Sequence, residues 1–113
     1  MTKLEGIFAA TITVLNEDLS LNVSDTIKHA KNVDMNGAGL AFLGSTSQSQ
    51  LLSIQEKKDL ISEIAKQKFK HQVIIGTGSN SLNDTKNLMR HSIELGHANF
   101  LIGNPAYYQN TNE

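Results

Sequence analysis

The sequence predicts an α/β fold with a parallel sheet, and two observations point to it. Apolar runs of strand length alternate with amphipathic helical patterns, which is typical of βαβ units. The strand runs are apolar on both faces, as expected where a parallel sheet is buried on both sides. Strand starts lie roughly 25 to 35 residues apart, which suits right-handed crossovers in either a (β/α)8 barrel or an open doubly wound sheet.

Four strands and three helices are expected from these patterns. The first helix spans residues 23–36, and Gly37 is placed to end it in a left-handed turn. The predicted strands lie at residues 6–13, 39–43, 73–76 and 99–102.

The second and third helices are predicted from their caps. Ser53 and Glu56 form a capping-box pattern in which each side chain can bond the other residue's amide. Ser81 gives a similar cap for the third helix, which is expected to stop at Gly96. The apolar positions expected to face the sheet are Ile27, Ala30 and Val33 in the first helix, Ile54, Ile61, Ile64 and Ala65 in the second, and Leu88, Met89 and Ile93 in the third.

The chain is short for a complete barrel, which usually needs roughly 250 residues. Residues 37–44 resemble residues 96–103, and each of these segments joins the end of a helix to a strand. No helix pattern follows the fourth strand, so the repeat stops in mid-unit. If the fold is a barrel, residues 1–113 are expected to be its N-terminal half, truncated after strand four.

The composition favours a small-molecule role. Ten basic residues balance 11 acidic ones, so the surface offers no large field to attract nucleic acid or anionic lipid. There is no cysteine, in agreement with a reducing compartment, and the N-terminus carries no long apolar run. We therefore expect a cytoplasmic protein with neither a nucleic-acid nor a membrane partner.

Ligands of both candidate architectures bind at the carboxyl ends of the strands, so the loops there are the places to search. The loop at 44–50 places several hydroxyls and backbone amides directly after a strand. Such groups can hold a carboxylate or a phosphate by several hydrogen bonds. The same composition also suits a polar turn with only local hydrogen bonds.

The loops after the third and fourth strands leave further alternatives open. Residues 76–81 carry two glycines between a strand and a helix, which would suit a small α/β phosphate- or nucleotide-binding module. However, Ser81 stands where Gly or Ala allows close helix packing, so a tight turn into a helix cap is the competing interpretation. Past the fourth strand, Tyr107 and Tyr108 can relay a proton, anchor a ligand or only pack.

No metal site or pair of catalytic carboxylates is expected. His29, His71, His91 and His97 show no metal-ligand spacing and fall on helices or connectors, which indicates solvated or structural roles. The acidic residues gather on helix faces, away from strand ends, so a paired-carboxylate hydrolase is not expected either.

Taken in order, four segments resemble the pyruvate-dependent class I aldolase family that includes dihydrodipicolinate synthase and N-acetylneuraminate lyase. The resemblance covers residues 4–110. The segments are the opening strand at 6–13, Gly-Ser-Thr-Ser-Gln at 44–48 in place of the family's Gly-Ser/Thr-Thr-Gly-Glu, Gly-Thr-Gly-Ser-Asn at 76–80, and Pro-Ala-Tyr-Tyr at 105–108.

The resemblance implies a (β/α)8 barrel whose members join pyruvate, or a pyruvoyl group of the substrate, to a lysine by a Schiff base, without a cofactor. Ser45 and Thr46 resemble the hydroxyl pair that receives the substrate carboxylate, and Ser45 would share in proton relay. Tyr108 resembles the tyrosine that completes this relay across a subunit interface, and Tyr107 would lie near that interface. The resemblance thus implies a 2-oxo acid substrate and a homo-oligomer.

Three positions depart from the family pattern, namely Val14 for proline, Ser47 for glycine and Gln48 for glutamate. We expect Ser47 to strain the loop or to crowd the carboxylate pocket. The lysines lie at the terminus or along helices, so the Schiff-base lysine of strand six would fall beyond Glu113. The chain is therefore expected to be a fragment of a lyase and to be inactive alone.

Overall fold

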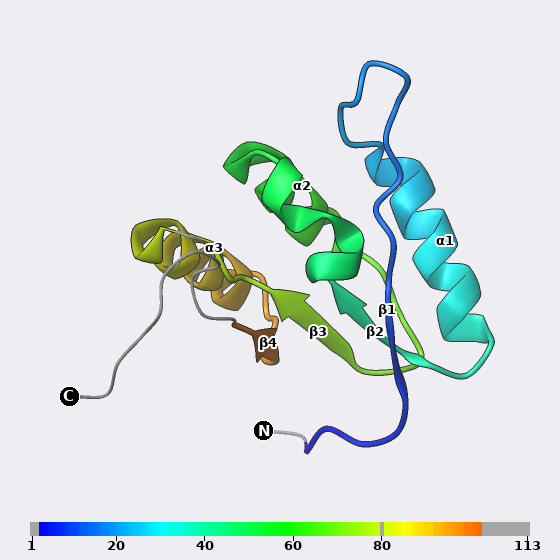
Figure 1. The fold of residues 1–113 in the computed structure, drawn as a ribbon. Helices are drawn as coiled ribbons and strands as arrows, with labels where there is room; N and C mark the ends of the chain where they lie inside the picture. The colour runs from blue at the N-terminus through cyan, green and yellow to red at the C-terminus, as the bar shows by residue number, and fades with distance from the viewer. Residues whose placement is uncertain (1–2, 80, 103–113) are drawn as a thin grey trace.

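The computed structural model describes residues 3–79 and 81–102 and contains one four-stranded sheet with three helices packed along it (Figure 1). Within these residues, no helix combines the length and the apolarity needed to cross a bilayer. The elements are β1 (Phe8–Ala10), α1 (Val23–Met35), β2 (Gly39–Phe42), the short 3-10 helices η1 (Ser45–Ser47) and η2 (Ser49–Leu51), α2 (Ile54–Ala65), β3 (Val73–Gly76), α3 (Leu82–Glu94) and β4 (Phe100–Leu101).

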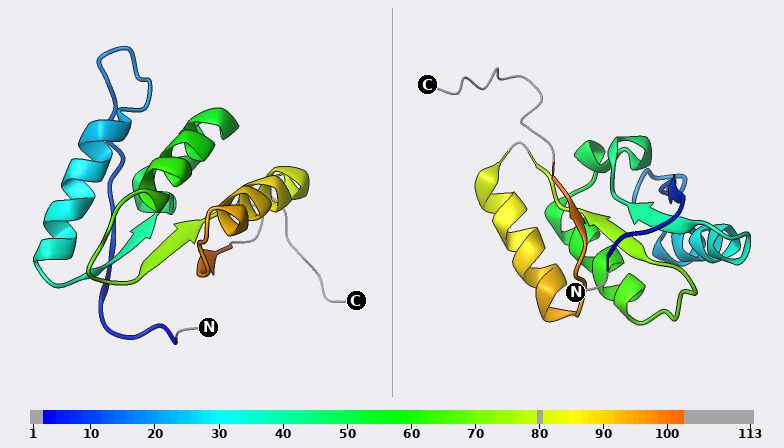
Figure 2. Two further views of the ribbon diagram at one scale, coloured as in Figure 1. Left: turned by 180° about the vertical axis from the view of Figure 1, so that it is seen from behind. Right: turned by 90° about the horizontal axis from the view of Figure 1, so that it is seen from below.

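The strands run parallel in the order β1-β2-β3-β4, so each strand pairs with the next one along the chain. The helices lie together on one side of the sheet, and no helix within residues 3–79 and 81–102 covers its other face (Figure 2). In an open doubly wound sheet the strand order reverses and helices cover both faces. The observed order and the one-sided helices confirm the α/β prediction in its half-barrel form.

The outer strands are shorter than predicted. The first strand was expected at 6–13, but β1 comprises only Phe8–Ala10 because its ladder runs along β2 alone. Likewise, β4 covers Phe100–Leu101 of the predicted 99–102. The third strand is confirmed at Val73–Gly76, and the second ends one residue early because Leu43 adopts a left-handed conformation, with φ 61°.

The predicted helix signals are confirmed. Ser53 and Glu56 make both bonds of the capping box, and the Ser81 side chain accepts from the Asp84 amide at 3.2 Å. Gly37 and Gly96, which end the first and third helices, have φ values of 99° and 97°. These matching left-handed turns show that the two resembling segments begin in the same way, since each turns the chain from a helix toward a strand.

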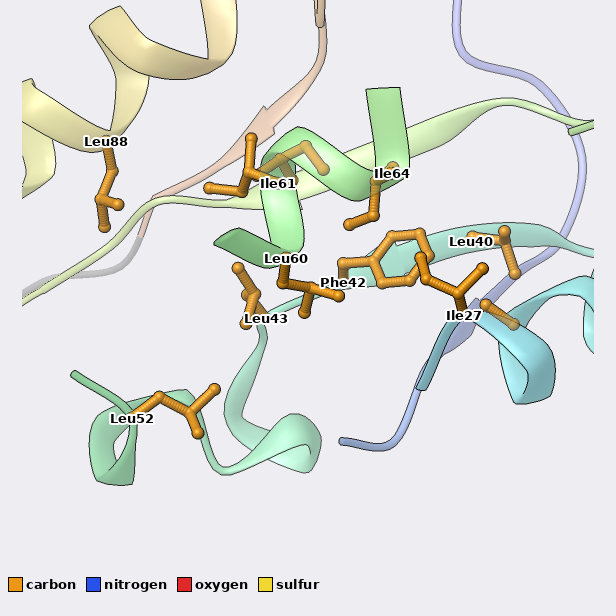
Figure 3. Close-up of a cluster of buried hydrophobic side chains, with 11 residues drawn as sticks. Ile27, Leu40, Phe42, Leu43, Leu52, Leu60, Ile61, Ile64 and Leu88 are labelled. Carbon is orange, nitrogen blue, oxygen red and sulfur yellow. The ribbon is translucent and has the colours of Figure 1, made fainter. Parts of the chain in front are cut away.

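The core lies between the helices and the covered face of the sheet (Figure 3). Leu40 and Phe42 project from β2 into this layer, and the Phe42 ring meets the Phe69 ring at a centroid distance of 6.1 Å. The prediction for Ile93 is wrong, because 57% of its side chain is exposed and no described element covers it. The buried apolar residues are Ile27, Ala30, Leu40, Phe42, Leu43, Leu52, Leu60, Ile61, Ile64, Ile75 and Leu88.

A buried carboxylate fastens the amino-terminal end of the sheet. Asp34, near the end of α1, accepts from the backbone amides of Lys70 at 2.8 Å and His71 at 2.9 Å. It also lies 2.9 Å from the His71 Nδ1 atom. Burial by itself raises the pKa of the Asp34 carboxyl, but these hydrogen bonds outweigh burial and the pKa is lowered. The contact joins α1 to the segment that leads into β3.

Replacing Asp34 by Asn is expected to lower the free energy of unfolding by about 2–3 kcal/mol near neutral pH, because hydrogen bonds to a charged acceptor are lost. The depressed folded-state pKa means that this contribution is present above the unfolded-state pKa and is lost as the pH falls through the folded-state value. Urea titrations across that acidic range should therefore show a smaller loss of stability for Asp34→Asn than for the parent chain. Exposed Glu94→Gln serves as the control, and equal pH dependence in the parent and Asp34→Asn would contradict the assigned role.

Candidate functional site at the carboxyl rim of the sheet

The loops that follow β2 and β3 meet at the carboxyl rim through a close backbone contact. A Cβ atom added to Gly76 would lie 2.3 Å from the Leu43 carbonyl oxygen, closer than any side chain can be accommodated. Leu43 itself has a left-handed backbone conformation, which ends β2 and turns the chain into the loop at the rim. Its side chain is buried in the core. Gly76 therefore serves strand packing, which favours the tight-turn interpretation of residues 76–81 over a nucleotide site.

The loop after β2 folds into two 3-10 turns that are tied to β1. The buried Ser47 side chain donates through its Oγ to the Thr11 carbonyl oxygen. The Ser47 amide bonds to the Gly44 carbonyl at 3.1 Å, and the Gln48 amide to the Ser45 carbonyl at 2.9 Å. Gln48 adopts the left-handed conformation, with φ 56°, whereas Ser47 does not. The expectation that Ser47 strains the loop is therefore wrong, since its hydroxyl anchors the loop instead.

Ser45 and Thr46 occupy the first turn of this loop and are both exposed. Ser47 is fixed below them by the first strand, so the turn holds its backbone while the two hydroxyl-bearing residues face solvent. Hydroxyls on a fixed turn at a strand end can donate hydrogen bonds to an incoming carboxylate. The structure places both predicted carboxylate-binding residues at the rim where ligands of this architecture bind.

The loop after β1 borders the same rim and is held by a glutamate. The Leu21 amide donates to the Glu56 carboxylate at 2.7 Å, and the Ser53 amide donates to it at 3.0 Å. Hydrogen bonds from Ser53 and then Leu21 lower the pKa of the Glu56 carboxyl. Between the two loops lies a hollow of about 400 Å³, lined by Thr13, Leu15, Leu19, Ser47, Gln48, Leu51 and Leu52.

The remaining predicted sites have different outcomes. Tyr107 and Tyr108 lie outside the described residues. His71 pairs with Asp34, the His91 Nε2 atom lies 3.0 Å from the Ser62 hydroxyl, and the His97 Nε2 atom lies 3.3 Å from the Ile61 carbonyl, in keeping with structural roles for these three. Across residues 3–79 and 81–102, no group of three or more His, Cys, Asp or Glu side chains is arranged to hold a metal ion.

Two rim features were missed by sequence reasoning. Thr11 is buried, and its hydroxyl donates to the Ala41 carbonyl at 3.1 Å, so it links β1 to β2 below the loop. Lys57 is 5% exposed on α2, where burial lowers the pKa of its amine while the charge of Asp84 raises it. Lys57 lies on a helix, so its sequence position resembles that of a solvated lysine and gave no signal of burial.

The fold and the rim together define this chain as half of an α/β barrel with polar loops along its carboxyl edge. The model of the dihydrodipicolinate synthetase family matches residues 3–113, and the chain belongs to that family.

Individual relatives agree with this assignment. The chain is 36% identical to the N-acetylneuraminate lyase of Histophilus somni strain 2336, with 96% of this chain and 38% of the lyase aligned. Among solved structures, Proteus mirabilis N-acetylneuraminate lyase superposes with a TM-score of 0.85 at 28% identity, over 98% of this chain and 38% of that one. A prophage protein of the same family from E. coli K12, in complex with pyruvate, gives a TM-score of 0.82 at 25% identity, over 94% of this chain and 36% of that one. The chain thus spans little more than a third of the length of the relatives it matches.

Gly76→Ala is expected to destabilise the chain by about 3 kcal/mol, at the upper end of overpacking effects, because the new methyl group meets backbone and not a movable side chain. Thermal or urea unfolding measures this loss. Gly44→Ala is the matched control, since the nearest atom to its added Cβ is a Leu101 methyl carbon at 3.9 Å. If the two alanine variants were equally stable, the close contact of Gly76 would be disproved.

Ser47→Ala should lower the free energy of unfolding by about 1–2 kcal/mol, since the Thr11 carbonyl oxygen loses its buried donor. Ser45→Ala, at an exposed position in the same turn, should change stability by less than about 0.5 kcal/mol. Urea unfolding of the two variants in parallel makes the comparison. A larger loss for Ser45→Ala than for Ser47→Ala would show that the loop is anchored differently.

Proposed function

We propose that this chain supplies the carboxylate-binding half of a Schiff-base-forming lyase that acts on pyruvate or on a pyruvoyl-containing substrate. The observation that carries the proposal is the exposed Ser45-Thr46 turn at the carboxyl rim of a family half-barrel. The pyruvate named for the E. coli K12 relative supports a 2-oxo acid as the substrate class. The reaction is aldol condensation or retro-aldol cleavage.

The residues divide the chemistry between them. The Ser45 and Thr46 hydroxyls receive the substrate carboxylate, and Ser45 also passes a proton. Tyr108 completes the relay from a neighbouring subunit, and Tyr107 lies at that interface. The exposed leucines at the rim hollow, Leu19 and Leu51, support contact with a second subunit there. The cysteine-free sequence supports the cytoplasm as the compartment.

The nucleophile is supplied outside these 113 residues. A Schiff-base lysine must have a neutral amine held in a desolvated pocket that opens onto the substrate. Among the described lysines, Lys57 has its pKa lowered by burial, but it lies on α2, whereas the family lysine stands on a strand. No turnover is therefore expected from the chain alone.

Borohydride reduction in the presence of pyruvate tests where the nucleophile lies. Mass spectrometry of the treated 113-residue chain should show no pyruvate adduct, and the Lys57→Arg variant should behave identically. An adduct on the parent chain that Lys57→Arg abolishes would place a nucleophile inside this chain and contradict the division of roles.

A chimera tests the rim residues in a complete barrel. In this chimera, residues 1–113 replace the aligned 38% of the Histophilus somni lyase, and the assay measures the rate of N-acetylneuraminate cleavage. Ser45→Ala should lower kcat about 100-fold, the lower end of what one proton-transferring group contributes. The matched control Ser24→Ala, at an exposed position on α1, should leave kcat unchanged. A folded chimera without activity, or an active one that tolerates Ser45→Ala, would contradict the proposal.

A further inference from the structure

The turn that joins α1 to β2 carries an asparagine followed directly by a glycine, Asn36 and Gly37 (Figure 1). No other asparagine in the sequence precedes a glycine. The pair matters chemically because the backbone nitrogen of the second residue can attack the side-chain amide carbon of the first. Glycine in the second position leaves that approach open, since it has no side chain and its backbone rotates freely.

Both residues of the pair are accessible to solvent. Asn36 and Gly37 are exposed, and they form the end of α1 and the left-handed turn after it. A Cβ atom added to Gly37 would meet no atom within 4 Å beyond its chain neighbours. Water, which the hydrolysis of an asparagine amide consumes, therefore has access to the pair in the folded chain.

Hydrogen bonds at the end of α1 hold the two reacting groups in place. The Asn36 side-chain amide donates through Nδ2 to the Asn32 carbonyl oxygen at 2.7 Å. The Gly37 amide, which would be the nucleophile, donates to the Asp34 carbonyl oxygen at 3.2 Å. Both bonds must break before the Gly37 nitrogen can reach the Asn36 Cγ atom. Local opening of a helix end requires less free energy than unfolding of the whole chain, so the reaction can proceed from the folded protein.

We propose that Asn36 is a site of spontaneous deamidation and that the hydrogen-bonded end of α1 limits its rate. After the turn opens, the Gly37 backbone nitrogen gives its proton to solvent and bonds to the Asn36 Cγ atom. The bond from Cγ to Nδ2 then breaks, and ammonia leaves a cyclic imide. Water opens this imide at either of its carbonyl carbons, so position 36 becomes aspartate or isoaspartate. The net reaction consumes water, releases ammonia and oxidises nothing, so it needs no further reactant.

The product weakens the joint between α1 and the sheet. A carboxylate at position 36 has no hydrogen to donate to the Asn32 carbonyl oxygen. Its negative charge also lies at the C-terminal end of a helix, where the helix dipole disfavours an anion. Asp34, two residues earlier, is the carboxylate that ties α1 to Lys70 and His71. Deamidation therefore acts in one direction, because the product loosens the same turn that restrained the reaction. The inference is independent of the chemistry proposed at the carboxyl rim, since α1 ends at the opposite end of the sheet.

The rate of deamidation in the folded and in the urea-unfolded chain is the first test. Both samples are incubated in mildly alkaline buffer, and peptide mapping by mass spectrometry follows the conversion of Asn36. The folded chain should react measurably but about 10- to 100-fold more slowly than the unfolded chain, because two hydrogen bonds must break first. Equal rates would show that the end of α1 offers no protection, and an unreactive Asn36 in urea would show that the pair is inert. Either result would overturn the proposal.

Two variants separate restraint by the fold from the reactivity of the pair itself. Asp34→Asn removes the charged tie to the segment before β3, so the rate in the folded chain should rise severalfold while the rate in urea stays the same. If Asp34→Asn does not fold, the parent chain in urea below its unfolding midpoint gives the same information, because its rate should rise as α1 frays. Asn36→Gln is the control, since its longer side chain must close a larger ring and should stay unmodified. A folded-state rate that neither Asp34→Asn nor urea raises would contradict the restraint.

The effect of the product is measured with Asn36→Asp. This variant should unfold at a lower urea concentration than Asn36→Gln, which keeps a donor and adds no charge at the end of α1. Equal unfolding midpoints for the two variants would contradict the loosening assigned to the product.

Discussion

The carboxyl rim depends on how closely the β3 backbone approaches the Leu43 carbonyl. No side chain fits between them, so β3 carries a glycine at position 76, and the chain leaves β2 through a left-handed residue. This exit directs the following turn back over β1, where the Ser47 hydroxyl reaches the Thr11 carbonyl. Three strands thereby fix the turn that exposes Ser45 and Thr46. A wider spacing at Gly76 would displace the turn and with it both hydroxyls.

The two ends of the sheet use polar groups for different purposes. At the amino-terminal end, both carboxylate oxygens of Asp34 lie within hydrogen-bonding distance of Lys70 or His71, so the carboxylate holds α1 against the entry to β3. At the carboxyl end, the Ser47 hydroxyl is likewise occupied by a structural hydrogen bond, whereas its neighbours Ser45 and Thr46 are exposed. This asymmetry is the general pattern of α/β barrels, in which one end stabilises and the other binds.

The features that could be predicted from the sequence are those set by local chemistry. The Ser53–Glu56 capping box and the left-handed glycines at positions 37 and 96 depend on residues a few positions apart, and all are present. The length of β1 was overestimated because a strand's extent depends on partners on both sides, and the described residues supply a partner on one side only. Ile93 was expected to be buried, but it is exposed because no described element packs over that part of α3.

At the site, the residue types could be interpreted from the sequence, but their tertiary contacts could not be predicted from it. The hydroxyls after β2 indicated only the loop at 44–50, and the family resemblance singled out Ser45 and Thr46 within it. A serine in place of a turn glycine suggested strain, yet the strain depends on φ, and the left-handed position falls one residue later, at Gln48. Lys57 is buried although it lies on a helix, and the helical pattern of α2 alone gave no signal of this burial.

The most direct test of these conclusions is a crystal structure of the chimeric lyase with pyruvate bound. The carboxylate of pyruvate should lie within hydrogen-bonding distance of the Ser45 and Thr46 hydroxyls, while the keto carbon is joined to a lysine contributed by the other half of the barrel. A carboxylate held by other groups, with the turn after β2 empty, would show that this rim is only a structural turn.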